Sequence, residues 1–270
     1  MSTRRLGGDP DDDTVAPALT ADRLTAGKVL ITGGSSGIGA ATARAFAERG
    51  ALVAVAGRSA TSLRRIAAQT GCAVITGDLR DRAVPARTID EAVGALGGLD
   101  IVVSNAGIGW SGRFVSMGES DIDSLLDVNL RAAAYIARAA IPHLLQRPGR
   151  LVFVGSVAGL LGAPDETWYS VTKAGLSCLA EMLRAELRTS GIGVSLVSPG
   201  VVDTAFFERR QVPYARRHPK LISAPAVART IVDVVDRGRD EAVVPAWLSL
   251  PAFLKANFPG LYRLLATRFA

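Results

Sequence analysis

Two side chains four residues apart are the best candidates for acid–base chemistry in this chain. Tyr169 and Lys173 stand in the segment YSVTK, inside a stretch whose apolar pattern predicts a helix over 167–190. Residues at this spacing project from one helix face about one turn apart. A tyrosine ordinarily has a pKa near ~10, and lowering it by ~3 units takes ~4 kcal/mol of phenolate stabilisation. A nearby ammonium supplies part of that energy, so we expect Lys173 to lower the pKa of Tyr169.

A second motif, KVLITGGSSGIGAATARAF, has the form of a strand, a glycine turn and a helix. Gly33 and Gly37 can take backbone angles closed to other residues, and Gly39 permits close approach of helix and strand. Amides at the start of the following helix would face an anionic group, helped by the helix dipole. We therefore expect this turn to hold the pyrophosphate of a nucleotide. The alternative is a tight connection that binds no ligand.

These motifs are positioned by an alternation of short apolar runs and longer amphipathic stretches. The expected strands are 28–32, 51–56, 72–76, 100–104, 150–155, 192–197 and 242–245. The expected helices are roughly 37–49, 60–70, 86–96, 119–146, 167–190 and 225–237. This order predicts an α/β protein with a single Rossmann-type, doubly wound parallel β-sheet flanked by helices on both faces. Ligands of such sheets bind beyond the carboxyl ends of the strands, where the motifs fall.

With these motifs the chain resembles the short-chain dehydrogenase/reductase family over about residues 26–245. TGGSSGIG (32–39) matches the family's cofactor turn, SNAG (104–107) its fourth-strand motif, usually NNAG, and SPGVVDT (198–204) the segment beside the nicotinamide. Asn129 and Ser156 precede Tyr169 by 40 and 13 residues, as in the family's active-site tetrad. The resemblance implies an NAD(P)-dependent oxidoreductase that interconverts an alcohol and a ketone or aldehyde by hydride transfer, with Tyr169 as general acid/base.

The resemblance also implies a role for each site residue. The catalytic residues would be Asn129, Ser156, Tyr169 and Lys173, where Ser156 binds the reacting oxygen and Asn129 anchors a water in a proton relay. Lys173 would also bind the nicotinamide ribose. The expected cofactor contacts are Gly33, Ser35, Ser36, Gly37, Ile38, Gly39, Arg58, Ser59, Asp78, Leu79, Asn105, Ala106, Gly107, Tyr169, Lys173, Pro199, Gly200, Val202 and Thr204.

The end of the second strand, LVAVAGRS, bears on the choice of nicotinamide. Gly57 occupies the position of the usual acid that binds the ribose hydroxyls, and Arg58 follows it. An arginine can grip a 2′-phosphate, which a carboxylate would repel, and Ser59 could add a hydroxyl contact. NADP(H) is therefore favoured, with NAD as the alternative because Gly34, Ser35 and Ser36 add no second basic residue in the glycine turn.

Composition limits other classes of function. The 270-residue chain is 49% hydrophobic with a formal charge of +6, and it has no basic–aromatic module of a nucleic-acid binder. Cys72 and Cys178 are expected to be small buried apolar residues, and no Cys/His cluster suggests a metal site. Residues 1–25 are expected to form a disordered acidic tail without a secretory signal. No apolar run reaches the ~20 residues of a membrane span, so we expect a cytoplasmic protein.

Two further segments bear on the substrate and partners. The expected lid, 203–223, carries basic residues that form either a solvated face or a dock for an acidic acyl carrier: Arg209, Arg210, Arg216, Arg217, His218 and Lys220. The apolar extension 246–270 is expected to pack on the body or a second subunit, with peripheral membrane contact as the alternative.

A small to medium hydrophobic substrate is favoured by apolar pocket candidates: Trp110, Leu160, Leu161, Ala163 and Phe206. We expect a homodimer or homotetramer through 119–146 and 167–190, because the second helix carries more apolar surface than one sheet contact needs. The rival hypothesis is a non-catalytic NAD(P)-binding sensor or scaffold on the same fold.

Overall fold

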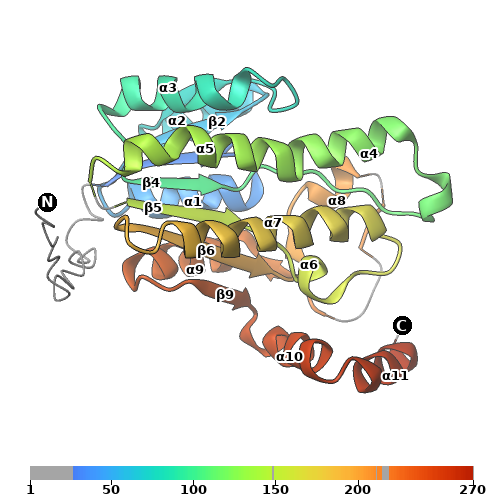
Figure 1. Cartoon of the computed structure of the whole chain (residues 1–270). Helices are drawn as coiled ribbons and strands as arrows, with labels where there is room; N and C mark the ends of the chain where they lie inside the picture. Colours follow the sequence, from blue (N-terminus) through green and yellow to red (C-terminus); the bar gives the residue numbers. More distant parts are fainter. Residues whose placement is uncertain (1–26, 148, 211, 215–218, 270) are drawn as a thin grey trace, which may run out of the picture.

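The computed structural model describes residues 27–147, 149–210, 212–214 and 219–269, so the expected tail at 1–25 lies outside the described residues. Seven parallel strands form one sheet in the order β3-β2-β1-β4-β5-β6-β9 (Figure 1). The strands are β1 (Lys28–Thr32), β2 (Leu52–Gly57), β3 (Ala73–Thr76), β4 (Ile101–Ser104), β5 (Gly149–Val154), β6 (Ile192–Pro199) and β9 (Glu241–Val244). The predicted doubly wound parallel sheet is confirmed.

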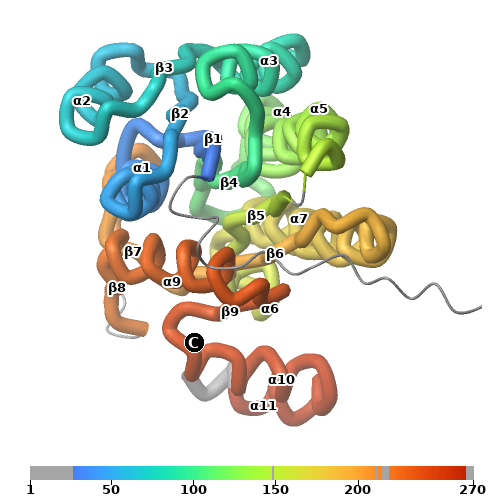
Figure 2. Tube along the Cα trace, turned by 90° about the vertical axis from the view of Figure 1, so that its left-hand side faces the viewer, coloured from blue at the N-terminus to red at the C-terminus, as the bar shows by residue number. Residues whose placement is uncertain are grey.

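Helices cover both faces of this sheet, on opposite sides in Figure 2. One face carries α1 (Gly37–Ala47), α2 (Ala60–Thr70) and α9 (Ala224–Asp236). The other carries α3 (Val84–Leu96), α5 (Ala132–Leu144) and α7 (Thr167–Glu186). The strand order reverses between β1 and β4, and their carboxyl ends form the crevice where ligands of such sheets bind.

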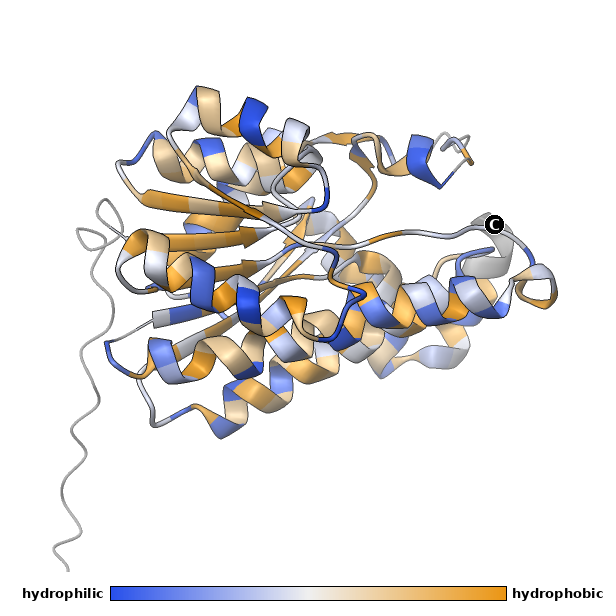
Figure 3. Ribbon diagram, turned by 90° about the horizontal axis from the view of Figure 1, so that it is seen from above, coloured by the Kyte–Doolittle hydropathy of each residue, from blue (hydrophilic) through white to orange (hydrophobic). Residues whose placement is uncertain are grey.

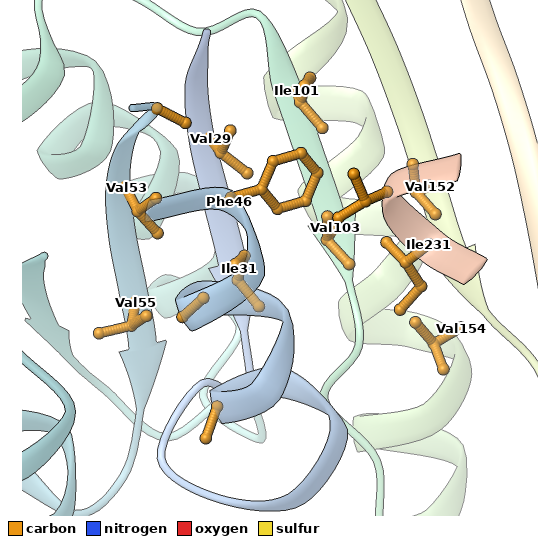
Figure 4. Packing of buried hydrophobic residues seen from close by; sticks show 14 of the residues in the cluster. Val29, Ile31, Phe46, Val53, Val55, Ile101, Val103, Val152, Val154 and Ile231 are labelled. Atoms are coloured by element: carbon orange, nitrogen blue, oxygen red, sulfur yellow. The ribbon is translucent and has the colours of Figure 1, made fainter. Parts of the chain in front are cut away.

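Successive side chains of each strand point to opposite faces of the sheet, so the strands contribute to two hydrophobic cores. In β1, Val29 and Ile31 point toward α1 while Leu30 points toward the opposite helices. Figure 4 shows the ring of Phe46 among Val29, Ile101 and Val103 of the sheet. The strands are mainly hydrophobic and the helices carry both kinds of residue in Figure 3, as expected for a sheet that is buried on both faces.

The long helix predicted over 119–146 is interrupted. It consists of α4 (Glu119–Leu126), a π-helical turn η3 (Asp127–Arg131) and α5. A π turn is a short interruption inside an α-helix, and the apolar pattern averaged over the whole of 119–146 did not locate it. The short elements η2 (Phe114–Ser116) and α6 (Val157–Leu161) were not predicted either.

Cys178 corrects a second expectation. Cys72 is buried as predicted, but Cys178 is exposed on the outer side of α7. Val171 and Met182, seven residues before it and four after, are also exposed, so all three lie along one side of the helix.

The chain after the sheet forms a separate helical unit. η4 (Ala246–Leu248), α10 (Ser249–Asn257) and α11 (Pro259–Phe269) stand beside the sheet rather than against either face (Figures 1 and 2). The expected lid contains β7 (Val202–Asp203), paired with β8 (Ile222–Ser223), and the short helix α8 (Phe206–Arg209). None of the helices in the described part of the chain is both long and apolar enough to cross a membrane.

Candidate active site

The glycine turn after β1 forms a tight cradle at the start of α1. Gly33 and Gly37 have positive φ angles of 67° and 54°, which favour glycine. A Cβ at Gly33 would lie 2.9 Å from the Cα of Ala106, and one at Gly39 would collide with the carbonyl oxygen of Gly33. The first α-helical bond of α1 runs from the Ala40 amide to the Ser36 carbonyl, so the amides before it face outward from the helix end. Such a cradle suits a phosphate group.

Hydrogen bonds fasten the SNAG segment after β4 to this turn. The hydroxyl oxygen of Thr32 accepts from the amides of Asn105 and Ala106, both at 3.1 Å. The Asn105 side chain donates to the carbonyl oxygen of Thr32 at 2.9 Å. Asn105 therefore acts in this structure by holding the two strand ends at the sheet's switch point together.

A single cleft of about 650 Å³ connects the expected cofactor and catalytic residues. It is lined by every predicted site residue except Gly39, Ser59 and Asn129. Gly39 contributes through the close approach described above. The segment after β6 reaches the glycine turn, because a Cβ at Gly37 would lie 3.0 Å from Cγ2 of Thr204.

The end of β2 places Arg58 in the wall of the cleft with its side chain exposed. Ser59 does not line the cleft; its hydroxyl caps α2 by accepting from the amide of Ser62 at 3.2 Å. The structure thus gives Ser59 a helix-capping role, and its expected cofactor contact stays a prediction. Asp78 lines the cleft, and its hydrogen bond with Arg80 holds the pKa of that carboxyl below its usual value.

The described basic residues of the expected lid are only partly a solvated face, because Arg209 and Lys220 are exposed whereas the Arg210 side chain is held in an ion pair. Arg210 pairs with Glu166 at 2.5 Å, has a side chain only 5% exposed, and stacks on Phe207 at 4.6 Å. Arg209 donates to the hydroxyl of Ser36 in the glycine turn at 3.1 Å. Lys220 is exposed, whereas Arg216, Arg217 and His218 lie outside the described residues. Sequence reasoning missed that Arg209 brings a second cation to the cofactor end of the cleft.

Tyr169, Ser156 and Lys173 meet in the wall of the cleft. Ser156 follows β5 and caps α6, since its hydroxyl accepts from the amide of Ala158 at 3.1 Å. Lys173, one turn beyond Tyr169 on α7, donates to the carbonyl oxygen of Val154 at 2.9 Å. Its Nζ atom lies 6.0 Å from the centre of the tyrosine ring. Tyr169 and Lys173 therefore lie on one face of α7, as the spacing predicted.

Burial favours the neutral forms of Tyr169 and Lys173 and shifts the pKa of each accordingly. The pKa of Tyr169 is raised to about 12, mainly by burial, while a hydrogen bond with Ser156 opposes the rise. An apolar cluster that includes Met117, Leu125 and Phe206 surrounds the ring. Burial likewise lowers the pKa of Lys173 to about 8. In the protein without cofactor, the loss of solvent around Tyr169 therefore outweighs the ammonium group of Lys173, and the pKa of the tyrosine is raised.

Asn129 lies behind this site, in the π-helical turn between α4 and α5. Its side-chain oxygen accepts from the amide of Ile108 at 2.8 Å, and its amide nitrogen donates to the Ile108 carbonyl at 3.0 Å. It also donates to the hydroxyl of Thr172 at 3.2 Å. Asn129 thus joins the loop after β4 to α7, next to Tyr169 and Lys173.

The far end of the cleft is largely apolar and includes residues that the sequence did not point to. Of the pocket candidates, Leu161, Ala163 and Phe206 line it, whereas Leu160 and Trp110 do not. The lining residues missed by sequence reasoning come from the lid and the C-terminal unit, and include Phe207, Tyr214, Leu248 and Tyr262. Only the apolar character of the extension could have suggested that it reaches the pocket.

Comparison with known proteins identifies the class to which this fold and site belong. Residues 27–213 match the short chain dehydrogenase family. An uncharacterized oxidoreductase from Staphylococcus aureus is 37% identical over 186 residues, covering 67% of this chain and 80% of the relative. The chain belongs to the short chain dehydrogenase family and is an NAD(P)-dependent oxidoreductase.

Solved structures with bound cofactors share the fold. A short-chain dehydrogenase/reductase from Burkholderia phymatum, in complex with NAD, has a TM-score of 0.79 at 26% identity and covers 88% of this chain and 95% of its own. A short-chain dehydrogenase from Burkholderia cenocepacia, in complex with NADP, has a TM-score of 0.73 at 32% identity, with coverages of 84% and 97%. Similar proteins have therefore been solved with either nicotinamide dinucleotide bound.

Proposed function

We propose that this protein is an NADP(H)-dependent oxidoreductase that interconverts a hydrophobic alcohol and its ketone or aldehyde, with Tyr169 as general acid/base. The observation that carries the proposal is that Tyr169, Ser156 and Lys173 line the same cleft as the glycine turn. A proton donor and a phosphate cradle in one cleft are what a hydride-transfer enzyme requires.

The residues of the cleft fit a bound nicotinamide dinucleotide. The amides that open α1 would hold the pyrophosphate, Arg58 the 2′-phosphate, and Lys173 the nicotinamide ribose. When bound in its reduced form, the cofactor supplies a hydride to the carbonyl carbon. The Tyr169 hydroxyl donates its proton to the carbonyl oxygen, which leaves an alcohol and a phenolate.

The pKa values of the two groups suit the reducing direction. With a pKa of about 12, Tyr169 is a neutral phenol at physiological pH and is ready to donate. With a pKa of about 8, Lys173 is mostly an ammonium ion at pH 7 and stabilises the phenolate that remains. Ser156 orients the reacting oxygen toward Tyr169, because its hydroxyl already hydrogen-bonds the tyrosine.

Two cations support NADP(H) over NAD(H). Arg58 lines the cleft beside Gly57, so position 57 carries no carboxylate to repel a phosphate, and the nearby carboxylate of Asp78 is already paired with Arg80. Arg209 reaches Ser36 in the glycine turn and compensates for the absence of a basic residue there. Together they give the cofactor end of the cleft a positive charge that favours the more anionic cofactor.

The substrate end supports a hydrophobic alcohol or carbonyl compound. Phe206 packs beside the Tyr169 ring, and Leu161 and Leu248 add apolar surface to the same cleft, which would bind an aliphatic or aromatic group. The basic lid gives less support to a carrier-bound acyl substrate, because Arg210 is paired internally with Glu166.

A panel of hydrophobic ketones and aldehydes with NADPH, followed at the nicotinamide absorbance, tests this proposal. Turnover of at least one carbonyl compound, with a lower rate for NADH, is the expected result. Tight NADPH binding without turnover of any compound would instead favour the sensor or scaffold hypothesis.

A further inference from the structure

The C-terminal unit presents a row of exposed apolar side chains. We name it the C-terminal apolar face and define it by six residues: Trp247, Leu250, Phe253, Phe258, Leu261 and Leu264. Leu250 and Phe253 lie three residues apart on α10, and Leu261 and Leu264 lie three residues apart on α11, so each pair is on one side of its helix. Trp247 precedes the first pair in η4, and Phe258 lies between the two helices. Exposed fractions of 58% for Trp247, 57% for Phe253 and 61% for Leu264 make this far more apolar surface than isolated residues give.

All charged side chains of the C-terminal unit are positive. The sequence from 246 to 270 contains Lys255, Arg263 and Arg268 and no acidic residue. Arg263 is exposed between Leu261 and Leu264, whereas Lys255 donates to the carbonyl oxygen of Leu160 at 2.9 Å. Apolar side chains with interspersed cations are the pattern that binds an anionic lipid surface.

The same unit forms part of the cleft's apolar end. Leu248 and Tyr262 line the cleft, and the Tyr262 hydroxyl contacts the carbonyl oxygen of Leu161 at 3.4 Å. The C-terminal apolar face is thus carried by the same short helices that border the proposed substrate pocket. A lipid surface bound there would lie next to the pocket.

We propose that the C-terminal apolar face docks on an anionic lipid bilayer, and that the lipophilic substrate reaches the cleft from this surface. The second part rests on the proposed function, whereas the docking does not. The favoured partner is lipid rather than a second copy of this chain, because a two-fold contact would bring the two sets of basic residues together. Phospholipid headgroups instead provide the opposite charge.

Co-sedimentation of the full chain with vesicles tests the docking. The vesicles contain phosphatidylcholine alone or phosphatidylcholine mixed with phosphatidylglycerol. The variants are the double substitution Trp247→Ser/Phe253→Ser, the charge reversal Arg263→Glu, and the control Leu52→Ser. Leu52 is 54% exposed and is the first residue of β2, so it lies at the amino ends of the strands, whereas the cleft lies at their carboxyl ends.

The wild type is expected to bind the anionic vesicles more strongly than the neutral ones, and less strongly in high salt. The double variant should lose about tenfold or more in partition coefficient, Arg263→Glu should lose about fivefold, and Leu52→Ser should match the wild type. Each variant should keep the far-UV circular dichroism spectrum and the unfolding temperature of the wild type, which shows that it is folded.

Failure of the wild type to bind anionic vesicles, or equal binding by the double variant, would overturn the proposal. If light scattering showed a dimer that the double variant abolishes, while vesicles stayed unbound, the face would belong to a second copy instead. Vesicle binding requires no turnover, so an inactive enzyme that still binds would refute the proposed function and leave the docking intact.

Discussion

Replacing Arg58 with alanine is expected to weaken the binding of NADPH and to leave NADH nearly unchanged. Arg58 lines the cofactor end of the cleft and would face a 2′-phosphate that NADH lacks. A charge-assisted hydrogen bond contributes ~1.5–3 kcal/mol. Because the side chain is exposed, water and salt screen the pair and the lower part of that range applies. A loss of ~1.5–2 kcal/mol corresponds to a Kd for NADPH that rises roughly 10- to 30-fold.

The companion change Gly57→Asp should invert the preference. A Cβ at Gly57 would have its nearest neighbours at 3.7 Å, in Leu63 and Ser35, so the new side chain fits without displacing them. Its carboxylate would repel the 2′-phosphate and offer NADH an acceptor for the ribose hydroxyls.

Fluorescence titration of each cofactor at low and high salt measures these effects, with Arg64→Ala on the outer side of α2 as the matched control. The loss on Arg58→Ala should shrink as salt is added. Equal losses for NADPH and NADH would mean that Arg58 only supports the loop, and the assignment to NADP would be refuted.

Three further predictions follow from the site and the helices around it. Arg209→Ala should raise the Kd of NADPH more than that of NADH, because Arg209 brings a positive charge to Ser36 in the glycine turn; an equal loss for both cofactors would mean that Arg209 does not contribute to the preference for NADP(H). Lys173→Met should be inactive yet more stable than the wild type at pH 7 in urea unfolding, by ~2 kcal/mol, because burial lowers the pKa of Lys173 to about 8 and penalises its ammonium form. This difference in the free energy of unfolding should become smaller between pH 8 and 10.5, because the unfolded chain still holds the proton that the folded protein has released. A difference that does not change with pH would show that the charge of Lys173 is not its cause. The protein should form a dimer or tetramer through α7, and Val171→Glu/Met182→Glu should convert it to a monomer in light scattering; a wild type that is monomeric at micromolar concentration would contradict this.

The sheet and the catalytic pair could be predicted because both depend on short-range patterns. Apolar runs bounded by glycine turns locate strands well, and the run at 28–32 coincides with β1. The four-residue spacing of Tyr169 and Lys173 fixes their common face on any α-helix. The carboxyl ends of parallel strands then bring the remaining motifs to one edge.

What could not be predicted depends on partners distant in the chain. Charge alone does not reveal that Arg210 pairs with Glu166, 44 residues before it, or that Arg209 reaches Ser36. The rise in the pKa of Tyr169 likewise depends on burial that the assembled fold creates. The C-terminal helices were missed because Pro251 and Pro259 look like interruptions, whereas both lie in the first turn of a helix, where proline is tolerated.

The substitution Tyr169→Phe tests the proposed acid–base role most directly, because it removes only the hydroxyl that is proposed to donate the proton. The quantity to measure is turnover. Steady-state reduction with NADPH should be compared with that of Tyr135→Phe, the same chemical change on α5 at a residue that does not line the cleft. We expect kcat to fall at least about a hundredfold in Tyr169→Phe while the Kd of NADPH is unchanged, and we expect Tyr135→Phe to behave as wild type. A Tyr169→Phe enzyme that retained a near-normal kcat would contradict the proposed mechanism.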